Sequence, residues 1–445
     1  MTIIEIDGSI LEGGGQLMRI SIGLSALLKK SIRIKNIRAG RSKPGLKAQH
    51  MCGLKLVQRL AGGKLEGCVM HSTELTYIPE QDNSLEPEPR AKQTKTNNSE
   101  ENQNKTDQDS TSHPYQKEIF EVDIGTNGAT TLLSQVALPV ALFRNYPTIL
   151  ELKGGTNNAD TAPPVEYYQH VFLPHLQHFG INFECNILKR SYNNPKGGGH
   201  LQLKIKPLMQ ALPPITLLKA RNHQKISYDI LAFTSNRVHP RVAQEIVHGA
   251  SNVLKSYGDN AKSRTSTTIT TNPNSTVPEV RSVMQHFDNN LAVGNGSSVL
   301  IKANVMALEE EKPLEAKEDT TKAFDNVPKQ VQTCLAASSD GSPKINPSKT
   351  GAKAARELLE QLNFDSESGF VNVLDQHAQD QLIIFMALAC GKSQIECGPL
   401  TLHTKTAIYI CELLTSAKFK VSDVDKNTVL IECQGIGYYS NHNNT

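Results

Sequence analysis

The residue whose type most directly suggests chemistry is His403, at the end of the segment Gly-Pro-Leu-Thr-Leu-His, where an apolar run stops and a helix is predicted to begin. A neutral imidazole is a nucleophile that can form a covalent bond to phosphorus. Arginine-containing loops elsewhere in the chain could form an anion site opposite this histidine. That combination predicts phosphoryl or nucleotidyl transfer. The alternative is an ordinary surface or partly buried histidine, since the chain has 14 histidines.

A glycine-rich loop near the N-terminus is a candidate anion site. Residues 12–16 read Glu-Gly-Gly-Gly-Gln, and Arg19 follows on the predicted helix. Glycines just before a helix leave unpaired N–H groups exposed at the positive end of the helix dipole, which favours a phosphate. The alternative is a tight strand-to-helix turn in which glycine supplies only backbone freedom.

A second loop is basic, with Arg38 and Arg41 on either side of Gly40. The next positions add further polar and basic side chains, namely Lys43, Lys47, Gln49 and His50. Guanidinium groups on a short loop can bind phosphate oxygens through two hydrogen bonds at once. Aromatic residues are absent from this stretch, which favours phosphate recognition over base stacking. The alternative is a solvated basic edge.

Asp380 and Gln381 directly precede the apolar run Leu-Ile-Ile-Phe-Met-Ala-Leu. They could cap a helix or point into a cleft and bind a ribose or the edge of a purine. The chain has neither a phosphate-binding P-loop motif nor a Gly-x-Ser-x-Gly elbow, and its histidines lack metal-ligand spacing. If ATP binds, the site must therefore be built without a P-loop.

The elements that position these residues occur in the same order three times. A helix, a strand, a loop, a second helix and further strands are predicted in each copy. The copies span 16–78, 130–205 and 378–433. This recurrence predicts a three-fold pseudo-symmetric α/β domain in which the loops at Arg38, Gly154 and His403 meet near one axis.

We expect three parts along the chain. Residues 1–206 hold the first two copies, 207–369 form an inserted smaller α/β domain, and 370–445 hold the third copy. The segments 80–117 and 309–350 contain few aliphatic residues, so we expect 80–117 to be a disordered insertion and 309–350 to be largely disordered.

Composition indicates a soluble intracellular protein. The hydrophobic content of 38% is enough for a packed core, and the net charge of +3 excludes a general polycation that coats nucleic acid. The eight cysteines show no zinc-finger or C-x-x-C spacing, and several lie within apolar runs, as expected of reduced thiols. The N-terminus does not read as a signal peptide, and no apolar stretch is long enough for a membrane span, so we expect no membrane association.

Taken together, the motifs resemble those of the RNA 3'-terminal phosphate cyclase family, and of its animal members in particular. The matching segments are Asp7-Gly8, the 12–16 loop, 37–46, Gln49-His50, 154–156, Pro163, 197–199, 380–383, 398–404 and 432–437. They cover nearly the whole chain except for the two polar segments. The resemblance implies a mixed α/β (α+β) fold of three repeats, each with two helices and four strands, and an inserted thioredoxin-like domain.

The resemblance also implies an activity. An RNA 3'-terminal phosphate would be converted to a 2',3'-cyclic phosphodiester in an ATP-dependent, ligase-type reaction that releases pyrophosphate and AMP. His403 matches the family's nucleophile, which forms a covalent histidine–AMP intermediate and then adenylylates the RNA end. ATP and Mg²⁺ would be the cofactors, with Glu12 as the metal contact. The substrate-phosphate positions are Arg19, Arg38, Arg41, Gln49 and His50, and the nucleotide positions are Gln135, Pro163, His377, Ala378, Gln379, Asp380 and Gln381.

One position departs from the family. His377 stands where a tyrosine is usual in the nucleotide pocket, and a smaller ring offers less stacking area to adenine. The expected partner is RNA with a 3'-terminal phosphate, and the sequence indicates no specific protein partner. The expected location is the nucleoplasm, with the cytoplasm as a second compartment.

Two alternatives have different functions. A cyclase-like scaffold of ribosome assembly would share the fold without catalysis, but that branch departs from the cyclases at the histidine and the basic loop. An enolpyruvyl-transfer enzyme would need a second three-repeat domain, for which the remaining sequence is too short.

Overall fold

The computed structural model describes residues 2–81, 117–157, 162–192, 197–219, 224–264, 279–307, 332–362 and 372–439. Of the two polar segments, 80–117 and 309–350, residues 82–116 and 309–331 lie outside these ranges, so the expectation of disorder there falls outside the described residues. Within the described ranges, no helix combines the length and apolarity needed to span a bilayer.

The first unit is a four-stranded sheet with two helices. Its elements are β1 (Ile4–Asp7), α1 (Gly15–Leu28), β2 (Ile32–Lys35), α2 (Ala48–Ala61), β3 (Lys64–Glu66) and β4 (Leu75–Ile78). The strand order is β1-β2-β4-β3, with β1 parallel to β2 and the other pairs antiparallel. Burial alternates along β2, where Ile32 and Ile34 face the core, as the period of a strand requires.

The second unit repeats this arrangement. It comprises β5 (Glu118–Asp123), α3 (Thr130–Leu142), β6 (Thr148–Lys153), α4 (Val165–Tyr167), the π-helical turn η1 (Tyr168–Phe172), α5 (Leu173–Gln177), β7 (Phe183–Ser191) and β8 (His200–Ile205). The second helix expected in this copy is therefore interrupted by a π turn. Pro174, at the start of α5, has no N–H to donate to the preceding turn, which accounts for the change in helix geometry.

The third unit has the same strand order but is split by the insertion. It comprises β9 (Thr216–Leu217), α8 (Gln376–Gln381), α9 (Ile383–Leu388), β15 (Lys392–Cys397), α10 (Leu402–Leu414), β16 (Lys418–Asp425) and β17 (Thr428–Gln434). In each unit the first strand is parallel to the second, and the fourth lies antiparallel between the second and third. The expected start of the small domain at 207 needs correction, because β9 pairs with β15. Two residues are too few to show a strand pattern.

The small domain has its own sheet and its own core. It comprises β10 (Gln224–Ser235), α6 (Arg241–Arg264), β11 (Glu279–Phe287), β13 (Gly296–Ala307), β14 (Gln332–Asp340) and α7 (Pro347–Leu362), with strand order β11-β10-β13-β14. The connecting strand β12 (Ala292–Val293) pairs instead with β7 of the second unit. Buried residues such as Ile230, Ile246 and Leu358 form the core of this domain.

One expectation about the small domain was wrong. Residues 332–350 are not part of a disordered segment, because they form β14 and the first turn of α7. Side chains of β14 alternate between two cores, with Cys334 and Ala336 in the core of the three units and Leu335 and Ala337 in that of the small domain. Most of these side chains are small, so the strand gave little apolar signal. A thioredoxin-like topology for this domain stays a prediction.

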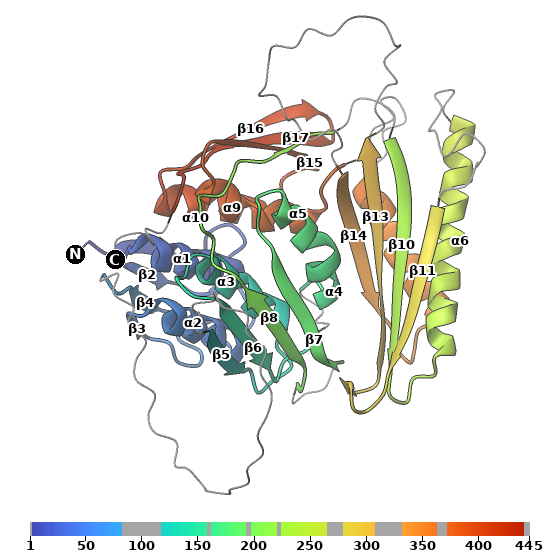
Figure 1. Cartoon of the computed structure of the whole chain (residues 1–445), viewed down its shortest axis with the longest axis horizontal. Coiled ribbons are helices and arrows are strands. Elements are labelled where there is room, and N and C mark those ends of the chain that lie inside the picture. Colours follow the sequence, from blue (N-terminus) through green and yellow to red (C-terminus); the bar gives the residue numbers. More distant parts are fainter. Residues whose placement is uncertain are drawn as a thin grey trace, which may run out of the picture.

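The helices of the three units pack against one another. Figure 1 shows the third unit, in orange to red, above the first and second units, with the small domain to one side and α6 on its outer face. Helix α1 contacts α2, α3 and α10, and residues of all three units share one continuous core. This packing brings together the N-terminal ends of α1, α2 and α10, where the candidate site residues lie.

Candidate active site

His403 is the second residue of α10 and its side chain is exposed. Thr401 caps this helix, because its hydroxyl oxygen accepts a hydrogen bond from the Thr404 N–H at 3.1 Å. The cap fixes where the helix begins and leaves His403 in its first turn. The next residue, Thr404, is buried. A reactant can therefore approach the ring of His403 from solvent.

The imidazole of His403 is held by a residue of the first unit. Its Nδ1 lies 2.9 Å from Oε1 of Gln16 on α1, and Gln16 Nε2 donates a hydrogen bond to the carboxylate of Asp380 on α8. An amide oxygen can only accept, so His403 Nδ1 carries the proton and Nε2 keeps its lone pair. The three side chains thus form a chain of hydrogen bonds that ends at a potential nucleophile.

The surroundings of the ring favour its neutral form, mainly through partial burial. Burial lowers the pKa of His403 below its ordinary value, and the positive charges of Arg19 and Arg41 act in the same direction. The nearby carboxylate of Glu12 opposes them. At neutral pH the imidazole is therefore uncharged, as nucleophilic attack requires.

Asp380 lies in an environment that favours its protonated form. Burial raises the pKa of its carboxyl group to about 7, against the opposing effect of Arg19 and the Gln16 hydrogen bond. Burial also lowers the pKa of Arg19 to about 10, so this guanidinium stays charged at neutral pH. Arg19 is accordingly the fixed positive charge between the two acidic residues Asp380 and Glu12.

Glu12 joins the N-terminal loop to the basic loop and to α10. Its Oε1 forms an ion pair with Arg41, and its backbone N–H donates to the Thr406 hydroxyl at 3.2 Å. Its Oε2 is buried and has no hydrogen-bond partner among the described residues. A buried carboxylate oxygen without a donor is suited to a cation.

Arg38 serves the basic loop itself. Its Nη1 donates to the carbonyl oxygens of Lys43 and Gly45, each at 2.9 Å, and its side chain is buried. The backbone of Arg38 is left-handed, with φ of +54°, at the turn that leads to Arg41. Arg38 therefore lies on the same loop as Arg41, another predicted phosphate residue. One of its guanidinium nitrogens already donates hydrogen bonds within this loop and stabilises it.

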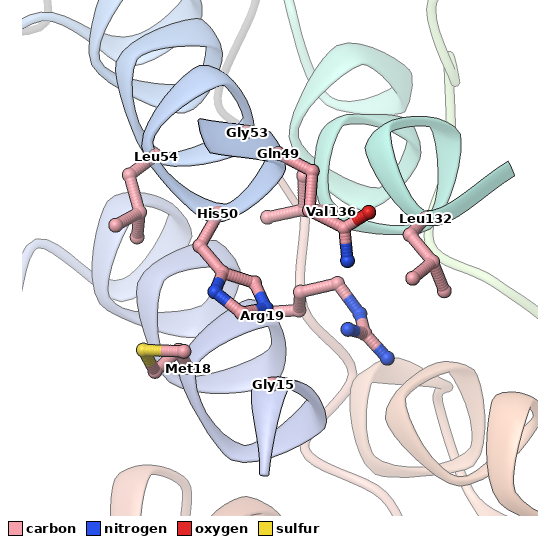
Figure 2. Close-up of a pocket in the computed structure, with 9 residues that line it drawn as sticks. All are labelled: Gly15, Met18, Arg19, Gln49, His50, Gly53, Leu54, Leu132 and Val136. Atoms are coloured by element: carbon pink, nitrogen blue, oxygen red, sulfur yellow. The ribbon is translucent and has the colours of Figure 1, made fainter. Parts of the chain in front are cut away.

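Arg19, Gln49 and His50 converge on one pocket between α1, α2 and α3 (Figure 2). Gly15 and Gly53 line the pocket as well, and its remaining walls are the apolar side chains Met18, Leu54, Leu132 and Val136. Figure 2 shows the Arg19 guanidinium beneath the amide of Gln49, with the His50 ring beside the Arg19 chain. An anion in this pocket would meet three hydrogen-bond donors in apolar surroundings, where charge-assisted bonds are strong.

The hydrogen bonds of His50 and Gln49 fix which of their atoms can serve a ligand. His50 Nδ1 accepts from the Lys47 backbone N–H at 3.1 Å, so the proton of the neutral ring is on Nε2. Burial lowers the pKa of His50 to about 3, and Arg19 contributes to the shift, so the ring stays neutral. Gln49 Oε1 accepts from the Ala129 N–H at 3.2 Å, which leaves its Nε2 as a donor.

The predicted nucleotide residues fall into two neighbouring pockets. Gln135, Asp380 and Gln381 line one of them together with Gln16 and Arg19. The other lies between the second unit and the small domain. It is lined by Pro163, Tyr167, Gln376 and His377, and on the side of the small domain by Ala336, Ala337, Ser338, Glu357, Glu360 and Gln361.

Two further predicted nucleotide residues are buried in the protein framework. Ala378 is fully buried. Gln379 donates to the Gly398 carbonyl at 2.8 Å and accepts from the Thr401 N–H at 3.2 Å. It therefore ties α8 to the loop that presents His403, which is a positioning role.

Sequence reasoning missed two residues of the site. Gln16 was read only as part of the glycine-rich motif, and no local pattern shows that it meets His403, 387 positions away. Asp375 caps α8 through the N–H groups of His377 and Ala378, at 2.9 and 2.8 Å. Its carboxylate also accepts from the Tyr167 hydroxyl at 2.6 Å. An Asp before a predicted helix is a cap signal that could have identified Asp375.

Comparisons with known proteins bear on this site. A family model described as RNA 3'-terminal phosphate cyclase matches residues 10–421. A Dictyostelium discoideum protein named probable RNA 3'-terminal phosphate cyclase is 35% identical over 445 residues, which covers 98% of this chain and 83% of that protein. The RNA 3'-terminal phosphate cyclase of Drosophila melanogaster is 29% identical over 436 residues, with 98% and 97% covered. One from Desulfurococcus amylolyticus is 29% identical over 439 residues, with 98% and 99% covered.

Proposed function

Because the chain belongs to the RNA 3'-terminal phosphate cyclase family, we propose that it converts the 3'-terminal phosphate of an RNA into a 2',3'-cyclic phosphate in an ATP-dependent, ligase-type reaction. The observation that carries this proposal is the exposed imidazole of His403, whose Nδ1 is engaged by Gln16 and whose Nε2 is left to react. An arginine and two further donors line a pocket at the N-terminal ends of the neighbouring helices.

The reaction would have three steps. In the first, the Nε2 lone pair of His403 bonds to the α-phosphorus of ATP, the bond to the bridging oxygen breaks, and pyrophosphate leaves. In the second, an oxygen of the RNA 3'-phosphate bonds to that phosphorus, and the nitrogen–phosphorus bond breaks. In the third, the 2'-hydroxyl oxygen attacks the RNA phosphorus, AMP leaves, and the hydroxyl proton passes to solvent. The first two steps thus convert an oxygen of the RNA phosphate, a poor leaving group, into AMP, a good one.

The two pockets lined by His377 and by Gln16 suit the nucleotide. His377 and Tyr167 lie edge to face, with ring centroids 5.7 Å apart and an interplanar angle of 82°, next to Pro163. These surfaces can enclose a nucleobase. In the other pocket, Gln381 Oε1 is buried without a partner among the described residues, so it can accept a hydrogen bond from a ribose hydroxyl.

The pocket of Arg19, Gln49 and His50 suits the RNA 3'-phosphate. Two neutral donors and one fixed positive charge can hold its oxygens without taking up a proton near neutral pH. Arg41, on the braced loop, is half exposed and can reach a phosphate at the entrance. These residues would orient the RNA phosphate toward the adenylyl group, which is the contribution of positioning to catalysis.

A magnesium ion would take most of its oxygen ligands from the triphosphate of ATP and few from the protein. No group of three or more acidic, histidine or cysteine ligands occurs in the part of the chain that the structure describes. Glu12 supplies the unpartnered carboxylate oxygen that such an ion needs from the protein. When bound, the ion would neutralise phosphate charge, while Arg41 and Thr406 orient Glu12.

Incubation of the purified protein with α-labelled ATP and no RNA tests the proposal. We expect labelled protein, no label with His403→Ala, and wild-type labelling with the control His248→Ala, whose side chain is exposed on α6 of the small domain. A non-catalytic scaffold would acquire no label in any variant. Retained labelling of His403→Ala would move the nucleophile to another residue.

We also propose a nuclear location with a cytoplasmic pool, which imaging of the tagged protein would check.

A further inference from the structure

We propose that Gln16 is a positioning residue for self-adenylylation, which orients the His403 ring and selects the tautomer with a free lone pair on Nε2. This inference rests on the proposed role of His403 as nucleophile. Gln16 is only 5% exposed, and its Oε1 lies 2.9 Å from His403 Nδ1. A buried side chain held at both ends of its amide has little freedom to turn away.

The amide has one favourable orientation. Its Nε2 donates to the Asp380 carboxylate, so its Oε1 must face the histidine. Where Asp380 is ionised, the reversed amide would place an oxygen acceptor against a carboxylate oxygen and lose this charge-assisted hydrogen bond. Asp380 therefore fixes Gln16, and Gln16 fixes the proton on Nδ1 of His403.

The ring needs such a partner because little else holds it. Its side chain is exposed, and within the described residues the Gln16 amide is the one hydrogen-bond partner of the ring. An unpaired neutral imidazole in water favours the tautomer with its proton on Nε2, which has no lone pair at the reacting atom. The charged or titratable groups that face the ring are Glu12, Arg19, Arg41 and His377, and none of them can impose the Nδ1 proton through a hydrogen bond that the structure shows.

Nitrogen spectroscopy of the full-length protein tests the tautomer directly. With ¹⁵N-labelled histidine, two-bond ¹H–¹⁵N correlations distinguish an Nδ1 proton from an Nε2 proton, and His403→Ala identifies the His403 signals by their loss. We expect the Nδ1–H tautomer in the wild type and a shift toward Nε2–H in Gln16→Met. An Nε2–H tautomer in the wild-type protein would overturn the inference without any variant.

Single-turnover self-adenylylation supplies the second readout. We expect Gln16→Met to lower the maximal rate by about 10- to 100-fold, the scale for loss of a positioning contact, with the ATP concentration at half-maximal rate little changed. The control Gln58→Met removes a comparable amide on α2, which donates to Gly63 O at 3.1 Å, and should leave the rate unchanged.

The outcomes separate this inference from the proposed function. A wild-type rate and tautomer in folded Gln16→Met would refute the role of Gln16 and leave His403 as the nucleophile. An absence of adduct in the wild type would refute the proposed function. The tautomer spectra would still decide whether Gln16 determines which nitrogen of the His403 ring is protonated. If Gln16→Met does not fold, the shorter amide of Gln16→Asn provides the same comparison.

Discussion

At the scale of single residues, the site gives two histidines opposite tasks by engaging the same ring atom differently. His50 Nδ1 accepts a hydrogen bond from the Lys47 backbone, so its Nε2 is a donor. His403 Nδ1 donates to Gln16, so its Nε2 is an acceptor or nucleophile. Both rings have a pKa below the ordinary value, mainly through burial. The proposed function accordingly assigns anion binding to His50 and attack on phosphorus to His403.

The division of labour between the pockets predicts that Arg41 acts after the first step. Arg41→Ala should leave self-adenylylation within a few-fold of wild type, because the Gln16–His403 contact is untouched and Thr406 still holds the backbone of Glu12. Transfer of the adenylyl group to an RNA 3'-phosphate should fall by about 100-fold, the usual effect of losing one charge-stabilising donor. Labelled protein and labelled RNA, followed in one time course, measure the two steps.

A matched control for Arg41 is Lys35→Ala on β2, an exposed cation paired with Glu5 away from the pockets. It should change neither step. Equal losses in both steps for Arg41→Ala would show that this arginine serves ATP or the fold instead of the RNA phosphate.

Asp380 should make stability depend on pH. Its folded pKa of about 7 lies above the ordinary value of 3.8, so between these limits the folded state binds a proton that the unfolded state has lost. Stability attributable to this group therefore falls as pH rises through that window, by at most about 1.4 kcal/mol per pH unit. Urea unfolding at several pH values should show a smaller fall for Asp380→Asn than for wild type. Parallel curves of unfolding free energy against pH for the two proteins would contradict the raised pKa of the Asp380 carboxyl group.

At the scale of elements, the small domain depends on a close crossing of α6 and α7. A Cβ at Gly351 of α7 would lie 1.9 Å from the Ile246 carbonyl oxygen of α6, and one at Gly249 would lie 1.9 Å from Ser348 O. The backbones therefore touch at two glycines. Gly351→Ala must separate the helices, and we expect a loss of about 1–3 kcal/mol in the free energy of unfolding, as for other overpacked sites.

Gly23→Ala provides the matched control on α1. Its Cβ would meet nothing closer than Val136 O at 3.8 Å, an ordinary contact. Alanine is favoured over glycine in a helix by about 1 kcal/mol, so this variant should be neutral or slightly more stable. A neutral Gly351→Ala under the same conditions would mean that the two helices do not cross as closely as the structure shows.

Periodicity made most of these elements predictable. The buried spacing of Ala407, Ile410, Cys411 and Leu414 along α10 is a helical stripe that the sequence displays directly. Three features escaped because they have no local period: the two residues of β9, the break at Leu382 between α8 and α9, and the small side chains of β14. Tertiary pairing decides each of them.

At the scale of the whole molecule, the site depends on segments that are remote in sequence. The Gln16–Asp380 and Gln16–His403 contacts join residues 364 and 387 positions apart. The motifs identified the individual residues, but these pairings follow only from the packing of α1 against α10 and of α8 against α10. The small domain lies within this arrangement, since the Asp375 carboxylate that caps α8 also accepts from the Ala336 N–H of β14 at 3.0 Å.

A buried arginine of the second unit forms an ion pair within that unit and also contacts the small domain. Arg190 of β7 pairs with Glu166 of α4, and the two side chains are 2% and 4% exposed. The guanidinium carbon of Arg190 also lies 4.6 Å from each of the ring centroids of Phe233 and Phe287, which belong to β10 and β11 of the small domain. Removal of the arginine would leave a buried carboxylate without its charge partner and the two rings without a cation.

We therefore expect Arg190→Met to lower the free energy of unfolding by about 3–5 kcal/mol, the scale for breaking a buried pair. Arg190→Met combined with Glu166→Leu should recover much of this loss, because no uncompensated charge remains. Urea unfolding followed by circular dichroism measures both.

Lys204→Met, which breaks the exposed pair with Glu184, is the control and should be close to wild type. If Arg190→Met were as mild as this control, Arg190 would not be what secures the small domain against the second unit. Recovery in the double variant without recovery of self-adenylylation would instead show that the pair also sets the pocket that Pro163 and His377 share with the small domain.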